Sequence, residues 1–514
     1  EGTVSDELPK VYETVVHMLA AAGENAGDAC ALSFEGRDLS YSQYLRSVGG
    51  FATELVELGV RGGRVALVCG NSLEMAIALF AVHAAGAQAV PINPIYTARE
   101  MTHILEDSDP TVVVYDNETA AVVEPLIKEL GIVNGILVGG NGGRLLDSWR
   151  DDASAKLPEP LPGPDDFATL QYTGGTTGLP KGVNITHGQM SVNLSQREAF
   201  LPTRLDNETV ICIMPLFHVF ASSMCLHLTA YCRGRLVILA RYRPDVVLDT
   251  IENEKITRLP AGPTIFNGLM DFEGFETRDF SSLVTAYSGS APLPVETLKR
   301  WEELTGCPIL EGYGQSEAGP VLTYVAEGDV LKPGSVGRAI PQTEVQIVDT
   351  DTGTKILAPG EQGEIRAHGP QIMSGYRNRP EETAEALRGG WLYTGDIGEL
   401  DEEGILYIRD RKKDMAIVGG YNVYPREIDE VLFAHPAVLE AAAVGVPDDY
   451  RGEVIRALVV VKPGEAVTEE SLLVYCQENL AKYKVPAMIN IVDDIPKTTI
   501  GKIDKKALRE LATS

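Results

Sequence analysis

The chain has 514 residues, and its 44 basic and 73 acidic side chains give a formal net charge of −29 at pH 7. This length is too great for one hydrophobic core and predicts roughly two to four folding units, each with an interior drawn from the 44% apolar content. The negative field argues against wrapping nucleic acid or lying on an anionic membrane, because it repels phosphates at long range. A polyphosphate ligand would therefore need a local cationic pocket.

The cysteines and the N-terminal segment indicate a reducing compartment. The seven cysteines contain no CxxC pair, so they predict neither a disulfide framework nor a zinc site. The first residues are acidic where a secretory signal would be cationic, and we expect a cytoplasmic protein. The apolar stretch 75–92 is interrupted by His83, Gly86 and Gln88 and is too short for a stable membrane span. We interpret it as a buried helix followed by a buried strand.

Helical and strand-like stretches alternate along the first part of the chain. A helix is expected over 41–59, a strand over 65–70, a helix over 73–85 and another strand from Val112. This alternation predicts α/β layers whose parallel strands are buried on both faces. Residues 151–166 are polar and rich in proline, which is typical of a surface loop. From about residue 335, short β-like runs between turns predict a small barrel or an antiparallel subdomain.

Charge separates the last fifth of the chain from the rest. From Arg409 to the end there are 15 basic and 17 acidic residues, a net charge of −2, which leaves −27 for residues 1–408. The asymmetry predicts a separate C-terminal domain, used either as a mobile cationic cap over an anionic ligand or simply to balance the larger domain.

Residues 172–182, YTGGTTGLPKG, combine four glycines and three threonines with one lysine, Lys181. Backbone amides, hydroxyls and a lysine together are typical of a loop that binds nucleotide phosphates. The segment is not a Walker A loop, because Pro180 precedes the lysine and Gly182 follows it. By composition alone, a solvated turn is the alternative.

Four further motifs follow this loop: EGYGQSEAGP (311–320), YTGDIGEL (393–400), RDRKKDMAIVGGYNVYPREIDE (409–430) and PKTTIGKIDKK (496–506). In order and spacing the set resembles the adenylate-forming superfamily, which contains acyl-CoA synthetases, 4-coumarate-CoA ligases, luciferases and peptide-synthetase adenylation domains. The resemblance spans the chain. It is strongest to the acyl-CoA synthetase and coumarate branches.

The resemblance implies a fold and a reaction. The expected fold is α/β: a large N-terminal domain, residues 1–412, built from two α/β subdomains and a small β-barrel, and a mobile C-terminal α+β lid, residues 413–514, with a hinge near Lys413. The expected reaction joins a carboxylate to ATP, with Mg²⁺, to give an acyl-adenylate and pyrophosphate. The acyl group then passes to the thiol of CoA, with release of AMP.

The resemblance also implies residue roles. Lys502 is expected to stabilise charge during adenylation, Ser316 to contact the α-phosphate, and Glu317 to hold Mg²⁺. Asp396 and Arg411 are expected at the ribose, and Tyr313 is expected to pack on the adenine. The remaining predicted ATP- or AMP-binding residues are Thr173, Gly174, Gly175, Thr176, Thr177, Lys181, Gly289, Ser290, Ala291, Pro292, Glu311, Gly312 and Gly314. Gly419, Gly420 and Tyr421 are expected to line a pantetheine tunnel after domain rotation. Lys505 and Lys506 are interpreted as solvated charges on a helix surface.

The acid and the acceptor remain open. His218 stands where amino-acid-activating relatives carry Asp, which argues against α-amino acids and suggests a gate beside the substrate carboxylate. A lone histidine in an apolar run is more often structural, but the context of the other motifs favours the gate. The residues expected around a fatty or aryl acyl group are Val219, Phe220, Met224, Gly262, Ala318 and Gly319.

The chain ends soon after Lys502, so the acceptor is expected to be separate: free CoA, or alternatively a carrier protein. A luciferase-like oxygenase and a noncatalytic binding protein are further alternatives, although the latter would be expected to lose Lys502, Glu317 or Asp396.

Overall fold

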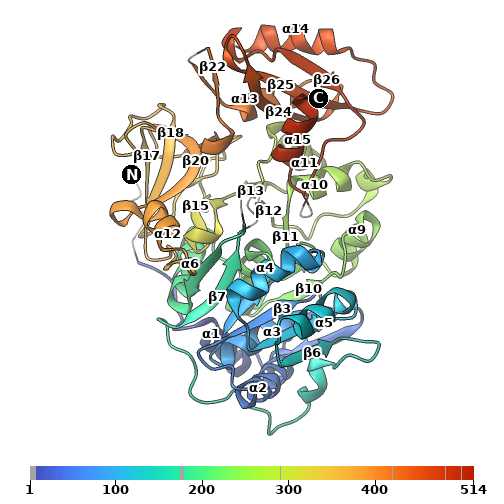
Figure 1. The fold of residues 1–514 in the computed structure, drawn as a ribbon. Helices are drawn as coiled ribbons and strands as arrows, with labels where there is room; N and C mark the ends of the chain where they lie inside the picture. The colour runs from blue at the N-terminus through green and yellow to red at the C-terminus, as the bar shows by residue number, and fades with distance from the viewer. Residues whose placement is uncertain are drawn as a thin grey trace.

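The computed structural model describes residues 7–173, 179–289, 291–419, 421–480, 482–498 and 501–513. In Figure 1, two α/β units coloured blue to green lie at the bottom, a β-rich part in orange lies to one side, and the red C-terminal part lies on top. Within the described ranges, no helix has both the length and the apolar character needed to cross a membrane.

The first sheet has seven strands in the order β19-β8-β7-β4-β3-β5-β6, and β7, β4, β3, β5 and β6 are parallel to one another. Val65 and Leu67 of β3 face a cluster that contains α3, whereas Ala66 and Val68 face α4 and α5. Burial on both faces accounts for the continuous apolar runs of these strands. The strands are β3 Arg64–Val68, β4 Gln88–Pro91, β5 Val112–Asp116, β6 Asn134–Val138, β7 Phe167–Tyr172, β8 Gly182–Thr186 and β19 Gly375–Tyr376. The helices are α2 Tyr41–Glu57, α3 Leu73–Ala84, α4 Ala98–Ser108 and α5 Ala120–Glu129, which confirms the helices expected at 41–59 and 73–85.

The second sheet also has seven strands, in the order β13-β12-β11-β9-β10-β1-β2. They are β1 Cys30–Phe34, β2 Arg37–Ser40, β9 Thr209–Cys212, β10 Arg235–Ile238, β11 Arg258–Ala261, β12 Thr285–Ser288 and β13 Ile309–Glu311. The helices here are α1 Val15–Asn25, α6 His187–Phe200, α7 Val219–Ala221, α8 Leu228–Cys232, α9 Pro244–Asn253, α10 Pro263–Met270 and α11 Val295–Thr305. Between α7 and α8, residues Ser222–His227 form a π-helix, η2. A capping box between Thr186 and Gln189 fixes the start of α6.

The β-rich part after residue 312 consists of two antiparallel sheets. One contains β14 Tyr313–Gly314, β15 Val321–Tyr324 and β16 Arg338–Ala339, and the other contains β17 Glu344–Val348, β18 Gly363–His368, β20 Leu392–Leu400 and β21 Leu406–Arg411. Helix α12, Pro380–Ala386, flanks them. The predicted α/β class is confirmed, and the closed barrel stays a prediction because the strands are organised as two sheets.

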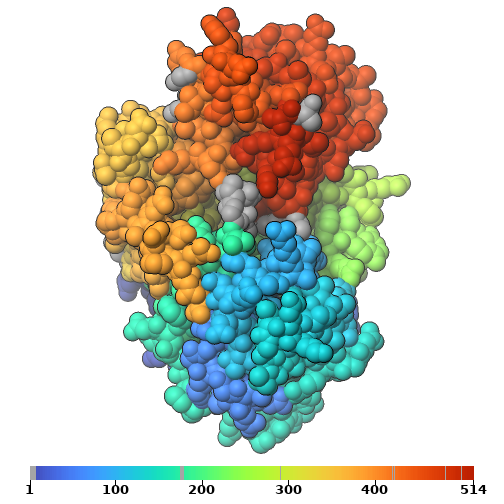
Figure 2. Space-filling model, viewed as in Figure 1, coloured from blue at the N-terminus to red at the C-terminus, as the bar shows by residue number. Residues whose placement is uncertain are grey.

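The C-terminal part has its own hydrophobic cluster, formed within residues 416–489. Its strands are β22 Ala416–Val418, β23 Tyr421–Val423, β24 Val438–Asp448, β25 Gly452–Val461 and β26 Met488–Ile491, and its helices are α13 Pro425–Phe433, α14 Glu469–Asn479 and α15 Lys505–Thr513. The short 3₁₀ helices of the chain are η1 Leu146–Trp149, η3 Phe275–Thr277, η4 Ser316–Ala318, η5 Arg388–Gly390, η6 Lys412–Asp414 and η7 Lys482–Lys484. Figure 2 shows this part in red, resting against the orange and green surfaces.

Candidate active site

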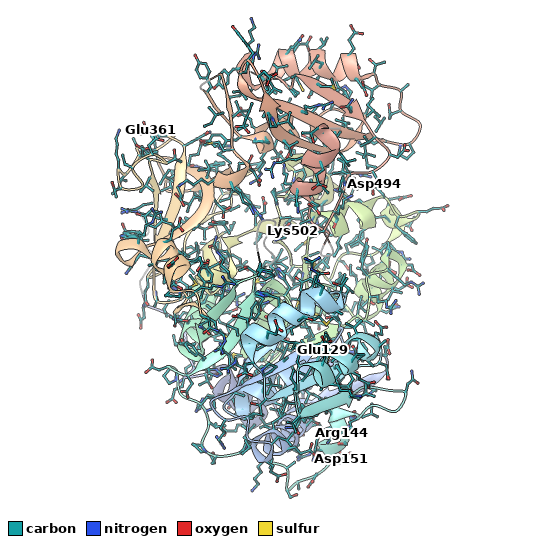
Figure 3. All side chains as sticks on the ribbon, viewed as in Figure 1. Glu129, Arg144, Asp151, Glu361, Asp494 and Lys502 are labelled. Carbon is teal, nitrogen blue, oxygen red and sulfur yellow. The ribbon has the colours of Figure 1, made fainter. Side chains whose placement is uncertain are left out.

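Lys502 projects from the C-terminal part toward the larger one, near the centre of Figure 3. A tight turn holds it: Gly501 N donates to Thr498 O at 2.9 Å, and Thr498 N donates to Lys502 O at 2.6 Å. Gly501 has a φ of +78°, a conformation that glycine adopts without steric cost. The lysine interacts electrostatically with Arg411 and Asp396, and its charge also acts on His218. Four residues expected at the site, each from a different segment of the chain, therefore meet in space.

Burial and neighbouring charges set the protonation states in this cluster. Burial and, to a smaller extent, the Arg411 cation lower the pKa of Lys502 to about 8, while Asp396 opposes both. Burial, with the charge of Lys502, lowers the pKa of His218 to about 4. His218 is therefore neutral at pH 7. Its Nδ1 accepts a hydrogen bond from Phe220 N at 3.1 Å, so the proton resides on Nε2.

Asp396 lies on β20, directly opposite Arg411 on β21. Its Oδ2 accepts a hydrogen bond from the hydroxyl of Tyr313 at 2.5 Å and a longer one from Gln315 Nε2 at 3.5 Å. Burial raises the pKa of Asp396, while Tyr313 and Arg411 oppose the rise. The predicted ribose and adenine residues are thus in direct contact.

Glu317 and Lys181 both lie against Tyr376, a residue outside the predicted set. The hydroxyl of Tyr376 donates to Glu317 Oε1 at 2.9 Å, and Lys181 Nζ lies 4.5 Å from the centroid of the ring, a cation–π contact. Tyr376 belongs to β19, which pairs with β8 immediately after Lys181. Because a lone tyrosine carries no motif, only the pairing of β19 with β8 reveals its position.

The ends of the predicted phosphate loop are joined by hydrogen bonds. Thr173 N donates to Lys181 O at 3.0 Å, and Lys181 N donates to Thr173 Oγ1 at 3.3 Å. The predicted residues Gly174, Gly175, Thr176, Thr177, Ser290 and Gly420 lie outside the described residues.

The small residues predicted around adenine lie in close contact with aromatic rings. A Cβ at Gly289 would overlap the ring of Phe220, and one at Gly312 would lie 2.8 Å from Cδ2 of Tyr324. Phe220, expected at the acyl group, therefore lies against the predicted adenine strand. Ala291 and Pro292 follow in the turn between β12 and α11. Gly314, on β14, pairs with Val321 of β15.

Glu311, at the end of β13, is buried and faces the C-terminal part. Burial raises its pKa to about 8. Of the two charged residues of α13 that act on it, Arg426 lowers the pKa and Glu430 raises it. The C-terminal part therefore contributes charged residues near Glu311 as well as Lys502.

A cavity of about 40 Å³ lies beside Ser316, and its lining includes two of the residues expected around the acyl group, Val219 and Gly319. Gly319 has a φ of +81°, and a Cβ there would overlap Gln371 O, so the position requires glycine. Ala318 is fully buried in the neighbouring cluster, and Gly262 precedes α10. Met224 contacts Arg197, a cavity residue that no sequence motif identifies.

Lys413, predicted for the hinge, and Gly419 and Tyr421, predicted for the tunnel, lie at the start of the C-terminal part. Lys413 is in η6, where Asp414 forms an ion pair of 2.7 Å with Arg509 of α15. Gly419 has a φ of +56°, and the side chain of Tyr421 is stacked on Tyr483 with 4.7 Å between ring centroids. Tyr421 is 59% exposed.

One prediction for α15 is wrong. Lys505 is not a solvated surface charge: its side chain is 17% exposed, Nζ donates to Ala443 O at 2.8 Å, and Asp429 lies 3.7 Å away. The packing of α15 on β24 draws this lysine inward. Lys506 is exposed, as predicted.

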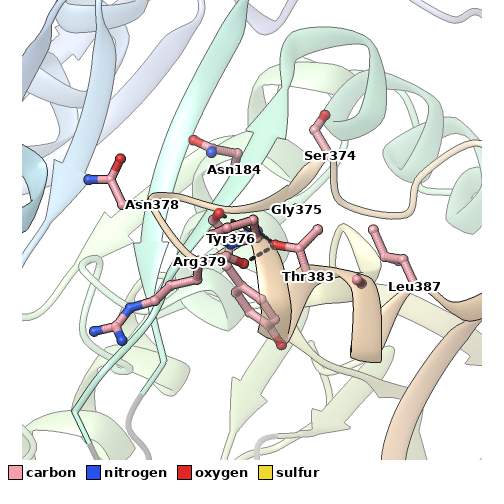
Figure 4. Close-up of a pocket in the computed structure, with 10 residues that line it drawn as sticks. Asn184, Ser374, Gly375, Tyr376, Asn378, Arg379, Thr383 and Leu387 are labelled. Atoms are coloured by element: carbon pink, nitrogen blue, oxygen red, sulfur yellow. Dashed lines mark hydrogen bonds between the residues drawn. The ribbon is translucent and has the colours of Figure 1, made fainter.

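A wider, open depression of about 630 Å³ lies on the outer side of β19 and α12 (Figure 4). Its lining includes Tyr376, whose backbone N donates a hydrogen bond to Thr383 Oγ1 at 2.9 Å. Lys502, Asp396 and His218 are not part of this lining. The depression is therefore separate from the charged cluster, and Tyr376, which lines it, also contacts Glu317.

Comparison with known proteins places this geometry in a family. Residues 19–377 match the model of the AMP-binding enzyme family, and residues 427–502 match the AMP-binding enzyme C-terminal domain. The chain is 36% identical to a long-chain-fatty-acid–CoA ligase of Bacillus subtilis (strain 168), an alignment that covers 99% of this chain and 96% of that relative.

Solved structures agree along the full length. The anthranilate CoA ligase AuaEII in complex with anthranoyl-AMP has a TM-score of 0.90 at 29% identity, covering 99% of both chains. ATP-bound MatB from Rhodopseudomonas palustris has a TM-score of 0.89 at 30% identity, covering 97% of this chain and 99% of that one. Apo MatB has a TM-score of 0.78 at 31% identity, covering 96% and 98%, so the present arrangement is nearer to the ATP-bound form. With both family models matched in order across the chain, this protein belongs to the AMP-binding enzymes of the adenylate-forming superfamily.

Proposed function

We propose that this chain is an ATP-dependent carboxylic acid:CoA ligase of the AMP-forming type. The observation that carries the proposal is the meeting of Lys502 with Asp396, Arg411 and His218 in one partly buried site. The names of the relatives, among them a long-chain-fatty-acid–CoA ligase and an anthranilate CoA ligase, support the same class of reaction.

In the first half-reaction, the substrate carboxylate attacks the α-phosphorus of ATP, and the bond to pyrophosphate breaks. Negative charge grows on the phosphate oxygens, and the Lys502 ammonium stabilises it electrostatically. Ser316, on the 3₁₀ turn η4, offers its hydroxyl to the α-phosphate. Lys181 and the amides of its loop bind the outer phosphates.

Mg²⁺ would be held by Glu317. Its carboxylate suits the hard oxygen ligands that this ion prefers, and Tyr376 donates only to Oε1, which orients the group. When bound, the ion would neutralise phosphate charge.

The nucleoside is held by the elements around β20. Asp396 accepts hydrogen bonds from the ribose hydroxyls, with Arg411 beside it, and Tyr313 packs on adenine next to Gly289, Ser290, Ala291 and Pro292. The contact between Tyr313 and Asp396 ties the base and ribose positions together.

In the second half-reaction, the CoA thiol attacks the acyl carbon and AMP leaves. We infer that residues 413–514 rotate about Lys413, which withdraws Lys502 and brings Gly419, Gly420 and Tyr421 to the site. The exposed position of Tyr421 in the present arrangement supports this second role. Neutral His218 offers an Nε2 proton beside the substrate carboxylate.

The test is a panel of aliphatic and aryl carboxylic acids assayed for CoA-dependent release of AMP and pyrophosphate. Formation of AMP, pyrophosphate and an acyl-CoA supports the proposal. ADP as the nucleotide product contradicts it. Adenylate formation that no CoA can discharge would instead favour a carrier protein as acceptor.

A further inference from the structure

An arginine on α6 lines the cavity beside Ser316. The wall is mixed: Ile185, Met190, Leu194, Val219 and Pro320 give it apolar surface, and a polar part is formed by Gln171 of β7, Arg197 of α6 and the π-helical residues Ser222, Ser223 and His227. π-Helical turns are rare and occur frequently at functional sites. With a volume of about 40 Å³, the cavity is far below the several hundred Å³ typical of a site for a long alkyl ligand.

Arg197 is buried, with 2% of its surface exposed, and its hydrogen bonds are weak or incomplete. Nη1 donates to Met224 Sδ at 2.7 Å and Nη2 to Ser223 O at 3.4 Å, while Nε has no partner. A guanidinium has five N–H donors and keeps its charge at all ordinary pH values. A thioether and one distant carbonyl leave most of that capacity unused.

The nearby carboxylates do not hydrogen-bond to Arg197. Glu198, the next residue of α6, accepts both the N–H and the hydroxyl of Thr203 through Oε2, while its buried Oε1 has no partner among the described residues, and it acts on Arg197 through its field. Glu208 forms its ion pair with Arg258. Within the described part of the chain, no carboxylate lies within ion-pair distance of Arg197.

A purely structural role explains this arrangement poorly. Burying a guanidinium whose donors are incompletely hydrogen-bonded is costly even beside the field of Glu198, and an apolar side chain of similar length would fill the space beside Met224 without that cost. Burial lowers the pKa of Arg197, because removal of the guanidinium from water disfavours its charged form. The charge is therefore best accounted for by an anionic group that enters the cavity.

On the basis of the proposed function, we propose that Arg197 binds a second carboxylate on the acid substrate, so that the enzyme activates short dicarboxylic acids. One carboxylate reacts beside Ser316 at the mouth of the cavity, and the other enters the cavity at Arg197, where about 40 Å³ has room for a single carboxylate. Arginine pairs with a carboxylate through two parallel N–H donors, which satisfies the unused groups.

Polar neighbours complete this subsite. Ser222, Ser223 and Gln171 carry further hydroxyl and amide groups on the cavity wall. Burial, with the charge of Arg197, lowers the pKa of His227 to about 3, so this ring is neutral and adds no competing charge. An alkyl end in this position would leave the guanidinium unpaired, which separates the proposed substrate from that named for the Bacillus subtilis relative.

The test compares matched pairs of acids: butanoate with succinate, hexanoate with adipate, and octanoate with suberate. ATP–pyrophosphate exchange and CoA-dependent AMP release are measured for each. The wild type is expected to favour at least one dicarboxylic acid over its monocarboxylic partner by on the order of 100-fold in kcat/KM. Arg197→Met is expected to abolish this preference while keeping or raising activity on the monocarboxylic acid. Arg197→Lys, which keeps the charge but not the planar fork, is expected to fall between them.

The matched control is Arg300→Met on α11, whose arginine pairs with Asp271 on the surface and which should leave both activities unchanged. A wild type that favours the monocarboxylic acids in every pair overturns the inference and leaves the proposed function standing. An equal loss on both acids in Arg197→Met assigns the arginine a structural role and also overturns it. If no acid of either series supports exchange or AMP release, the inference is overturned, and only an equally negative result with the full aliphatic and aryl panel makes the proposed function fail as well. The comparison of dicarboxylic with monocarboxylic acids in the wild type tests the inference even if a variant does not fold.

Discussion

Replacement of Lys502 by methionine removes one positive charge from the site while keeping a side chain of similar length. Because we propose that this ammonium stabilises charge that develops during adenylation, we expect the rate of the first half-reaction to fall by on the order of 100- to 1000-fold. Thioester formation from a supplied acyl-adenylate needs no such charge and should be largely retained. The two half-reactions are thereby separated by one substitution.

The pKa of Lys502 gives this prediction a magnitude and a pH window. A fall from 10.5 to about 8, caused first by burial and then by Arg411, means that holding the charge costs about 3 kcal/mol in the free enzyme. The protonated form predominates below about pH 8, so kcat/KM for ATP should decline above that pH. Nucleotide phosphates offset the cost by supplying negative charge.

The same lowered pKa predicts an effect on stability. Between about pH 8 and 10.5 the unfolded chain binds more protons at this lysine than the folded chain does, so the free energy of unfolding of the wild type rises with pH in that window. Lys502→Met lacks this rise. At pH 7, where the wild type bears the full penalty, the variant should melt at a higher temperature.

The assays are ATP–pyrophosphate exchange, discharge of a supplied acyl-adenylate by CoA, and thermal unfolding from pH 7 to 10. Lys506→Met is the matched control, because it removes an exposed lysine four residues away. Equal loss of both half-reactions would refute the separate role of Lys502. A kcat/KM for ATP that stays constant through pH 8 to 9 would refute the pKa argument.

Three further outcomes are expected. Tyr376→Phe loses the hydrogen bond to Glu317 but keeps the ring, so the Mg²⁺ concentration needed for half-maximal activity should rise several-fold, measured by titration of the ion at fixed ATP. Gly319→Ala combines a strained φ with a backbone overlap and should lower the melting temperature more than Gly36→Ala, which has a φ of +79° but open space around it; equal effects would contradict the overlap. Asp396→Asn should raise KM for ATP about tenfold or more with a smaller effect on KM for the acid, and a reversed order would argue against its place at the ribose.

The sequence by itself determined the class of fold and the family. Alternating helical and apolar runs predict the first sheet correctly, because parallel strands covered on both faces must be continuously apolar, as in β3 and β5. The spaced motifs predict the residues around the nucleotide, and the structure brings Lys502, Asp396 and Arg411 of this set together. These patterns involve residues that are close together in the sequence, so they can be recognised without knowledge of the tertiary structure.

Other features arise only when distant segments pack together. The sequence placed Lys505 in solvent, but the contact of α15 with β24 buries most of its side chain. Tyr376 joins Glu317 to Lys181 because β19 pairs with a strand that lies almost two hundred positions earlier in the chain. Neither contact leaves a signal in the neighbouring residues.

The surroundings of the Arg197 guanidinium also depend on tertiary packing. In the sequence it is one arginine among the mostly polar residues 187–200, where a solvated position is the ordinary expectation. The π-helical segment 222–227 and the strand β7 line the cavity beside Ser316 together with Arg197, and no carboxylate of the described residues forms a hydrogen bond with this arginine. A charged side chain can be solvated, paired with another charge or available to a substrate, depending on which residues surround it in space. Packing of segments that are distant in the sequence brings those residues together, so the neighbouring residues in the sequence do not reveal them.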